Sequence, residues 1–307
     1  MSKKTILIAG PTASGKSKLA MTLARAHNGV VINADSMQVY RELRVLTARP
    51  SVADEAACAH KLYGYVGLSQ PYSVARWLED VGLEIENVRV NDQLPIIVGG
   101  TGLYFMALTK GLAPVPTIDD KVREAWRNES QERSREELHD MLRERDPDMA
   151  RRLRASDRQR VTRALEVVDG TGRSLSFWQE QRHAPLMPEG EFVGIVLERD
   201  RAELYRACDE RMETMVELGA LDELRVVYDM QLDRALPGMR ALGVSPLLRF
   251  IDGEITLDAA LYEAKRDTRR YAKRQLTWLR RNMIAWKHVN MKYIESFGGN
   301  SFPFIDS

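Results

Sequence analysis

Short apolar runs alternate with amphipathic segments over the first hundred residues of the chain. Residues 4–9, 30–34 and 94–98 are continuous runs of mainly aliphatic and β-branched side chains, a pattern typical of strands buried on both faces. Between the first two runs, residues 17–27 place Leu19 and Leu23 on one side of a helix. Buried strands separated by helices predict an α/β fold, a doubly wound parallel sheet covered by helices on both faces.

From about residue 112 the pattern is that of helices alone. Prolines 114 and 116 make a stiff connection into this stretch, and prolines 185 and 188 close it. Helix N-cap signals, two of them with the Glu or Gln of a capping box, lie at Thr117, at Ser134 with Glu137, and at Ser156 with Gln159. We expect residues 116–186 to form a helical insertion domain, and residues 1–115 and 187–307 to form the α/β core with its C-terminal helices.

After the insertion the strand and helix patterns return. A further buried strand is predicted over residues 191–197, a helix over 201–218, and two helices over about 258–286. Arg211 shares the apolar face of the helix over 201–218 with Leu204. An arginine on such a face reaches solvent or meets an anion, so a bound phosphate and a structural carboxylate are both open as its partner.

Composition limits the classes of protein that this chain can belong to. It has 307 residues, of which 44% are hydrophobic and 29% are charged, and this balance is that of a folded protein rather than a disordered one. The two cysteines, Cys58 and Cys208, lie far apart in the sequence, which excludes a disulfide scaffold and a Cys-based zinc site. Every apolar run is much shorter than the roughly 20 residues of a membrane span. We therefore expect a cytoplasmic protein that does not bind a membrane.

The near-neutral net charge of +1 hides a local imbalance. Residues 265–281 carry eight Lys or Arg and one acid. Segregated basic stripes are compatible with a nucleic-acid partner, whereas the simpler interpretation is a solvated helix face. Charge alone favours the simpler interpretation.

A phosphate-binding loop is the clearest motif in the sequence. The motif G-x-x-x-x-G-K-[ST] is matched by Gly10, Pro11, Thr12, Ala13, Ser14, Gly15, Lys16 and Ser17. It follows a predicted strand and precedes a predicted helix, as a phosphate loop requires. In such a loop the backbone N–H groups converge on an anion at the helix N-terminus, Lys16 reaches phosphate oxygens, and the Ser17 hydroxyl suits Mg²⁺. The core is therefore expected to be similar to a P-loop NTPase.

Two further polar residues follow predicted strands and so belong to the same sheet edge. Asp35 follows the strand over 30–34 and suits a general base or a metal ligand, with a turn cap as the alternative. Thr101 follows Gly99 and Gly100, where a second acid is absent and donors for an oxyanion are present. A Thr at this place is also compatible with a simple helix cap.

In the insertion, Gln159, Arg160 and Arg163 form a polar ridge opposite the apolar residues Val161 and Leu165. Gln and Arg can make bidentate hydrogen bonds to base edges, and Arg also binds phosphate. An ordinary solvent-exposed helix face is the alternative, and the ridge alone does not decide between the two.

Five separate motifs together resemble the tRNA dimethylallyltransferase family, also called tRNA isopentenyltransferases. They are GPTASGKS at 10–17, DSMQVY at 35–40, VGGTGLYF at 98–105, QRVTRALEV at 159–167 and TRRYAKRQLTWLR at 268–280. The resemblance extends in the same order from residue 5 to about 286. It implies transfer of a dimethylallyl group from dimethylallyl diphosphate to N6 of the adenosine 3′ of the anticodon, in tRNAs that read codons beginning with U.

The resemblance also implies roles for individual residues. Asp35 would be the base, and the loop at 10–17 with Mg²⁺ on Ser17 would hold the diphosphate, assisted by Thr101 and Arg211. The implied tRNA contacts are Asp35, Ser36, Met37, Gln38, Thr101, Arg123, Gln159, Arg160, Val161, Thr162 and Arg163. The insertion would grip the anticodon stem-loop, and residues 265–281 would face phosphates or brace the core.

The chain departs from the family pattern at two places. It has Leu46-Thr47-Ala48-Arg49-Pro50 where many relatives have Gly-Thr-Ala-Lys-Pro, and Gly243-Val244-Ser245 where they often have Gly-Tyr-Arg or Gly-Tyr-Lys. The second change removes an aromatic ring and a cation, so it puts that segment's share of tRNA binding in doubt.

Two other functions remain open from the sequence. A P-loop kinase of a small molecule would share the loop and the aspartate but would use ATP. A nucleotide-regulated RNA-binding module would need the basic stripes without Asp35. We expect a monomer, because the sequence shows no self-complementary apolar stripe.

Overall fold

The computed structural model describes residues 4–181 and 183–292, which form two compact units. The first unit contains the described residues up to Thr109 and from Leu186 onward, and the second spans Lys110–Pro185. The second unit starts before the predicted insertion, because the His183 N–H donates to the Leu112 carbonyl (3.0 Å) and so joins the two connecting segments.

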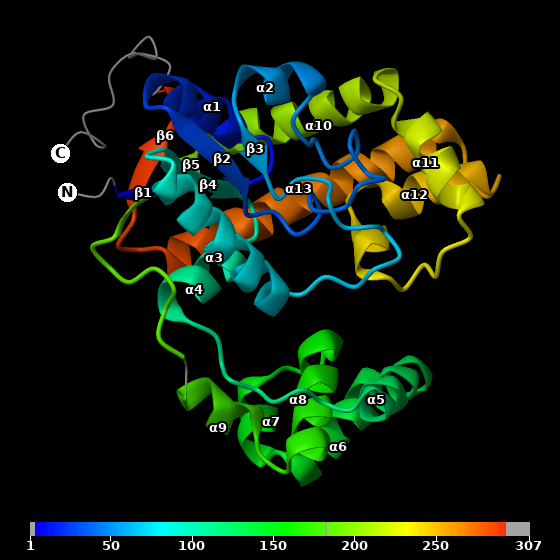
Figure 1. Ribbon diagram of the computed structural model, residues 1–307. Helices are drawn as coiled ribbons and strands as arrows, with labels where there is room; N and C mark the ends of the chain where they lie inside the picture. Colours follow the sequence, from blue (N-terminus) through cyan, green and yellow to red (C-terminus); the bar gives the residue numbers. More distant parts are fainter. Residues whose placement is uncertain (1–3, 182, 293–307) are drawn as a thin grey trace. The chain divides into compact units, whose positions relative to one another are not determined.

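A six-stranded parallel sheet forms the centre of the first unit (Figure 1). The strands are β1 (Thr5–Ala9), β2 (Gly29–Asn33), β3 (His60–Lys61), β4 (Leu94–Gly99), β5 (Phe192–Glu198) and β6 (Lys287–Asn290). Their spatial order is β3-β2-β4-β1-β5-β6, which places β1 between β4 and β5. The carboxyl ends of β1, β2 and β4 are therefore neighbours, and the prediction of a P-loop-like α/β core is confirmed.

Helices cover both faces of this sheet, as the doubly wound fold requires. Alternate residues of β1 point to opposite faces: Leu7 packs in the cluster that includes Trp77, whereas Ile8 packs in the cluster that includes Leu19. The covering helices are α1 (Lys16–Ala26) on one face, and α3 (Val74–Val90), α4 (Gly102–Lys110) and the C-terminal half of α13 (Leu257–Asn282) on the other.

Four further helices of the first unit form a third apolar cluster with residues 37–48. They are α10 (Arg201–Glu217), α11 (Ala220–Asp229), η1 (Pro237–Arg240) and α12 (Val244–Ile251). The short helix α2 (Val52–Ala57) has no buried residue and lies outside this cluster. The expectation of two helices over 258–286 is wrong, because α13 runs unbroken for 26 residues that contain neither Gly nor Pro. Within the described part of the chain, every helix is too short or too polar to cross a bilayer.

The second unit has its own small core of helices. Its elements are α5 (Asp120–Glu132), α6 (Arg135–Arg145), α7 (Pro147–Arg152), α8 (Arg158–Thr171) and α9 (Leu175–Glu180). Trp126, Leu142 and Leu165 are among the buried residues that hold these helices together.

Of the three predicted N-caps in this unit, one is confirmed. Ser134 and Glu137 form the expected capping box of α6. The predictions at Thr117 and Ser156 are wrong, because Asp119 and Asp157 cap α5 and α8 instead. In each case an Asp carboxylate closer to the helix accepts the orphan backbone N–H.

Candidate functional site

The loop between β1 and α1 curls around the N-terminus of that helix. Gly15 has a φ of 90°, in the left-handed region that glycine adopts without strain, and it is the N-cap of α1. The Gly10 N–H donates a hydrogen bond to the Gly99 carbonyl (3.3 Å), and the Ser14 N–H donates to the Pro11 carbonyl (3.2 Å). The structure therefore has the strand, loop and helix of a phosphate-binding loop, with an electropositive helix end beside it.

Two cations lie next to this loop. The Lys16 ammonium donates to the Pro11 carbonyl (3.2 Å), and the Arg211 guanidinium donates to the Thr12 hydroxyl. Burial lowers the pKa of Lys16 to about 8, a shift that the negative charge of Asp35 opposes and the positive charge of Arg211 reinforces. Burial also lowers the pKa of Arg211.

Arg211 forms no ion pair with any residue that the structure describes. The structural carboxylate that the sequence left open as its partner is therefore absent from the described residues. Two desolvated cations beside the electropositive end of a helix are stabilised by an anion such as a diphosphate.

The Asp35 carboxylate is held in a fixed orientation at the end of β2. Its Oδ1 accepts from the Met37 N–H (3.0 Å), and its own N–H donates to Oδ1 of the buried Asn33 (2.8 Å). Asn33 Nδ2 in turn donates to the Asp35 carbonyl (2.9 Å). Asp35 Oδ2 accepts no hydrogen bond from a described residue, so it is the oxygen that remains for a substrate.

Thr101 connects the end of β4 to the segment that carries Asp35. Its hydroxyl accepts from the Ser36 N–H (2.9 Å) and donates to the Ser36 hydroxyl (3.3 Å). Its N–H donates to the Ala34 carbonyl (3.2 Å). The Thr101 side chain is therefore not a helix cap for α4, and it holds the ends of β2 and β4 in register.

Three tyrosines lie close enough to Asp35 for its charge to affect their pKa. Burial raises the pKa of Tyr63, Tyr104 and Tyr271, and the Asp35 charge raises each of them further. The Tyr104 ring stacks on Trp77 with ring centroids 4.2 Å apart. These buried rings make this side of the site less polar than the protein surface.

One residue of this site that the sequence analysis did not single out is Gln275 on α13. Its side chain is 7% exposed and lies among the buried Ala272, Thr268 and Leu279. Gln275 Oε1 accepts from the Thr12 N–H (2.9 Å), and Nε2 donates to the Gly100 carbonyl (2.8 Å). A polar residue on the buried face of a helix was the available signal, the same one that identified Arg211.

The basic stretch on α13 divides into three groups, of which the first, Arg266 and Arg270, pairs with Asp267 on the same helix. Lys265 pairs with Glu213, Arg269 with Asp209, and Arg280 with Glu198, so these cations brace α13 against its neighbours. Three other cations are exposed and have no acidic partner among the described residues: Lys273, Arg274 and Arg281. These three unpaired cations can meet external phosphates.

The insertion carries the remaining candidate residues. Gln159, Arg160 and Arg163 are exposed at the start of α8, where Arg163 pairs with Glu166 (3.0 Å). Val161 is fully buried.

The Thr162 side chain is also buried, and its hydroxyl donates to the Arg158 carbonyl (2.9 Å). Of the residues over 159–163, therefore, Gln159, Arg160 and Arg163 present polar groups at the surface.

Arg123 lies on α5, level with the other end of α8. The two helices run antiparallel, because Arg158 at the start of α8 donates to the Ser130 carbonyl and Trp126 donates to Asp169 (2.9 Å). At a rise of about 1.5 Å per residue, Arg123 is more than one helical turn from Gln159 along this pair. Its guanidinium pairs with the exposed Asp120 (3.1 Å).

The two departures from the family pattern lie in the first unit. Arg49 donates to the carbonyls of Tyr40 and Arg41 (3.0 Å each), so it supports the loop that follows Asp35. Val244 is fully buried at the start of α12, whereas Ser245 is exposed. Val244 therefore serves the core, and Ser245 is left at the surface.

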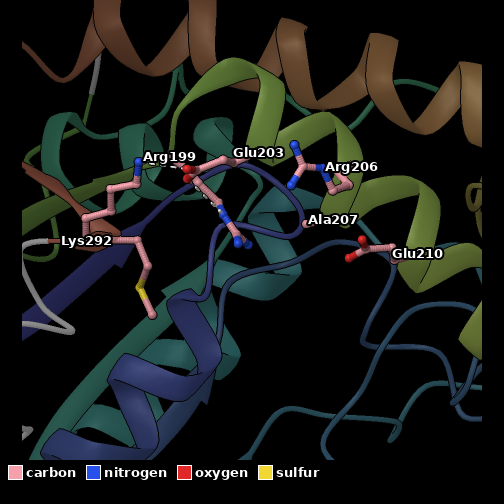
Figure 2. Close-up of a pocket in the computed structure, with 7 residues that line it drawn as sticks. Arg199, Glu203, Arg206, Ala207, Glu210 and Lys292 are labelled. Atoms are coloured by element: carbon pink, nitrogen blue, oxygen red, sulfur yellow. Dashed lines mark ion pairs between the residues drawn. The ribbon is translucent and has the colours of Figure 1, made fainter.

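A charged cavity of about 300 Å³ lies beside the phosphate loop (Figure 2). It is lined by Arg199, Glu203, Arg206, Ala207, Glu210, Met291 and Lys292. Glu203 pairs with Lys292 (2.7 Å) and lies 3.9 Å from Arg199, whose guanidinium also donates to the Ala13 carbonyl (3.4 Å). These ion pairs support the outer side of the loop, and the charged lining does not suit an apolar tail.

Sequence comparisons place the chain among known proteins. A model of the family described as IPP transferase matches residues 38–282, and one described as isopentenyl transferase matches residues 3–63. A tRNA dimethylallyltransferase of Parvibaculum lavamentivorans is 48% identical over 99% of this chain and 96% of its own length. One from Azorhizobium caulinodans is 48% identical over 92% of this chain and 90% of its own length.

Solved structures with the same fold have related activities. The full-length tRNA isopentenylpyrophosphate transferase of Bacillus halodurans is 32% identical to this chain, with a TM-score of 0.70. The match covers 99% of this chain and 97% of that chain. A eukaryotic dimethylallyltransferase acting on tRNA is 27% identical, with a TM-score of 0.74, 98% of this chain and 73% of that chain being covered.

These matches extend over nearly the whole chain, and they include the segments that carry the phosphate loop, Asp35 and Gln275. The small-molecule kinase interpretation is not favoured by them. The chain belongs to the tRNA dimethylallyltransferase family of prenyl transferases.

Proposed function

We propose that this chain transfers a dimethylallyl group from dimethylallyl diphosphate to N6 of the adenosine 3′ of the anticodon, in tRNAs that read codons beginning with U. One observation carries the proposal. The Asp35 carboxylate and the cations of Lys16 and Arg211 meet at the same end of the sheet, close enough for Asp35 to affect the pKa of both cations. A proton acceptor, Asp35, therefore lies next to an anion cradle, formed by the phosphate loop together with Lys16 and Arg211.

The cradle supports departure of diphosphate. Bond breaking between the allylic carbon and oxygen moves an electron pair onto the diphosphate, where the backbone N–H groups of the phosphate loop stabilise the growing charge. The ammonium of Lys16 and the guanidinium of Arg211 contribute charge-assisted hydrogen bonds to the same oxygens. The dimethylallyl tail then extends toward Asp35 rather than into the charged cavity beside Arg199.

The carboxylate supports attack by the adenine. An exocyclic amine is a weak nucleophile, because its lone pair is delocalised into the ring. As the N6–carbon bond forms, one N6 proton passes to Asp35 Oδ2, the oxygen that the Met37 turn leaves accessible. Because the orientation is set before the substrate arrives, little reorganisation is needed during the reaction.

Prenyl transferases of this family typically use a divalent metal, and we propose Mg²⁺. The described residues hold no cluster of three or more His, Cys, Asp or Glu that could cage a metal. The Ser17 hydroxyl is exposed at the start of α1, and an oxygen ligand of this kind together with diphosphate oxygens fits the preference of Mg²⁺. When bound, the metal would neutralise charge on the leaving diphosphate.

A tRNA is the acceptor that the family and its solved relatives support. In our proposal Arg123, Gln159, Arg160 and Arg163 grip the anticodon stem-loop, whose splayed bases are accessible to side chains. The segment from Asp35 to Gln38 and Thr101 receives the extruded adenosine. Since tRNA is modified in the cytoplasm in bacteria, we place the reaction there, and we propose that the chain acts as a monomer.

Incubation of the protein with magnesium, radiolabelled dimethylallyl diphosphate and unmodified tRNA tests the proposal. We expect label in the tRNA, at the adenosine next to the anticodon. A parallel reaction with γ-labelled ATP and no prenyl donor should transfer no phosphate. Transfer of phosphate to a small acceptor, or tRNA binding without label transfer, would refute the proposed reaction in favour of a kinase or of a binding module.

A further inference from the structure

Gln275 occupies an unusual place between the two halves of the site. It comes from α13, far along the chain from both partners, yet its amide lies between the loop that follows β1 and the loop that follows β4. Its partners also define its orientation: Thr12 offers a backbone N–H and Gly100 offers a backbone carbonyl, so Oε1 and Nε2 each have one possible position. The side chain is 7% exposed, which excludes a role in direct contact with bulk solvent.

The two loops that Gln275 joins have different tasks. On one side, the Thr12 hydroxyl is held by Arg211 while the Thr12 N–H is held by Gln275. On the other side, Gly100 precedes Thr101, whose hydroxyl holds Ser36 next to Asp35. A continuous set of hydrogen bonds therefore runs from the anion cradle to the segment that bears the carboxylate.

Gln275 packs closely against the backbone of Gly100. A Cβ placed on Gly100 would lie 2.3 Å from Gln275 Nε2 and 3.3 Å from Asp35 Oδ2. The backbone directly after β4 can therefore approach both side chains only because residue 100 is glycine. The Gln275 amide is held by both hydrogen bonds, so movement of this side chain would move the loop after β1 and the loop after β4.

We propose that Gln275 is a positioning residue that sets the distance between the bound donor and the Asp35 base. The inference rests on the proposed prenyl transfer. Lys16, Arg211 and the N–H groups of the phosphate loop remain when Gln275 is replaced, so the donor still binds. The substitution instead changes the distance between the anion cradle and the Asp35 carboxylate. Misplacement of reacting groups by about 1 Å lowers the rate of a reaction by about 100-fold.

The first test is Gln275→Leu, which keeps the side chain near its size and removes both hydrogen bonds. We expect kcat to fall by about 100-fold and the donor KM to change by less than about threefold. Gln231→Leu is the matched control, because Gln231 is exposed in the turn that follows α11, and it should leave both constants unchanged. A raised donor KM with an unchanged kcat would overturn the proposal, since Gln275 would then act in binding alone.

The second test is Gln275→Glu, which is nearly isosteric. When its carboxyl is protonated, it accepts from the Thr12 N–H and donates to the Gly100 carbonyl, as the amide does. When ionised, it cannot donate. Burial and the negative charge of Asp35 raise the pKa of such a carboxyl, whereas the cations of Lys16 and Arg211 beside the same loop oppose this shift. With burial the larger effect, the kcat of the variant relative to the natural protein should rise about tenfold from about pH 8.5 to about pH 6. The Leu variant should show a constant ratio, and a constant ratio for both variants would contradict the proposal.

A measurement without turnover separates this inference from the proposed function. Hydrogen exchange at the Thr12 amide should be slow in the natural protein and in Gln231→Leu, and at least about tenfold faster in Gln275→Leu. Unchanged exchange at Thr12 would overturn the bridging role. Absence of label transfer by the natural protein, with Thr12 protection lost in Gln275→Leu, would instead refute the prenyl transfer and keep the bridge.

Discussion

At the scale of single residues, the site is built from side chains whose surroundings change their chemistry. Asp35 presents one free oxygen because a turn hydrogen bond occupies the other. The Lys16 ammonium is buried, and the loss of hydration lowers its pKa to about 8. Each of these features gives a prediction for a single substitution or a single titration.

Replacing the base should affect the chemical step alone. Asp35→Asn keeps an oxygen that accepts from the Met37 N–H but removes the proton acceptor. We expect the single-turnover rate of prenyl transfer to fall by about 10²–10⁴-fold, with tRNA affinity nearly unchanged. Rapid-quench assays and filter binding measure the two quantities, and Asp229→Asn, an exposed position at the end of α11, is the control. An unchanged rate would remove Asp35 from the mechanism.

The depressed pKa of Lys16 predicts the pH dependence of donor capture. In the free enzyme Lys16 is charged below about pH 8 and loses its proton as the pH rises through that value. We therefore expect kcat/KM for the donor to decline above about pH 8, and kcat to persist to higher pH because bound diphosphate restores the charge. Lys16→Arg should shift the decline of kcat/KM upward. A decline at the same pH in this variant would assign the titration to another group.

At the scale of elements, α13 connects most of the functional features. Its buried face carries Gln275 toward the two loops, and its paired cations brace α10 and β5. One of these braces, at Glu198, reaches three elements. Glu198 on β5 accepts two hydrogen bonds from Arg280 of α13 (2.9 Å each) and contacts His288 of β6 (3.0 Å).

The Glu198 brace predicts a pH-dependent contribution to stability. Hydrogen bonds from Arg280, with a smaller contribution from His288, lower the pKa of Glu198 to about 2, from an ordinary value of 4.5. A carboxylate with a lowered pKa stabilises the fold above its unfolded-state pKa, and this contribution is lost as the pH falls from about 4.5 toward 2.

Urea unfolding of Glu198→Gln measures this contribution. At pH 7 we expect a loss of about 1 kcal/mol in the free energy of unfolding, because solvent screens the pair. The difference from the natural protein should shrink below about pH 4. A difference that stays constant down to about pH 3 would show that packing, rather than charge, accounts for the loss.

At the scale of the whole molecule, the net charge of +1 conceals an organised distribution. Many basic residues pair with acids within their own unit, and the exposed cations of α13 described above do not. A balanced net charge with a few unpaired cations suits a protein that binds one polyanion without binding polyanions non-specifically.

This distribution predicts which substitutions change the salt dependence of tRNA binding. Lys273→Ala, Arg274→Ala and Arg281→Ala should each reduce the slope of log affinity against log salt by about 1, because each removes one phosphate contact. Arg269→Ala should leave the slope unchanged, since Arg269 pairs with Asp209. Equal slopes in all four variants would show that α13 does not contact the tRNA backbone.

The sequence by itself determined the main elements and much of the site. Strand and helix periodicity predicted the parallel sheet and a helical insertion, since buried strands and amphipathic helices differ in the spacing of their apolar residues. The phosphate loop was predictable because its backbone curl depends on glycines at set positions. Asp35 and Thr101 were predictable because ligands gather where parallel strands end.

Tertiary structure alone decided what depends on distant segments meeting. Gln275 contacts Thr12 and Gly100, which are so distant from it in the sequence that no local pattern predicts the contacts. The contact of Arg211 with Thr12, which places Arg211 beside the phosphate loop, is likewise visible only in the folded chain. The caps of α5 and α8 and the unbroken length of α13 also differed from expectation, because neighbouring carboxylates and tertiary packing outweigh local signals at helix ends. Periodicity records which face of an element is buried, whereas the partner that buries it is a property of the folded chain.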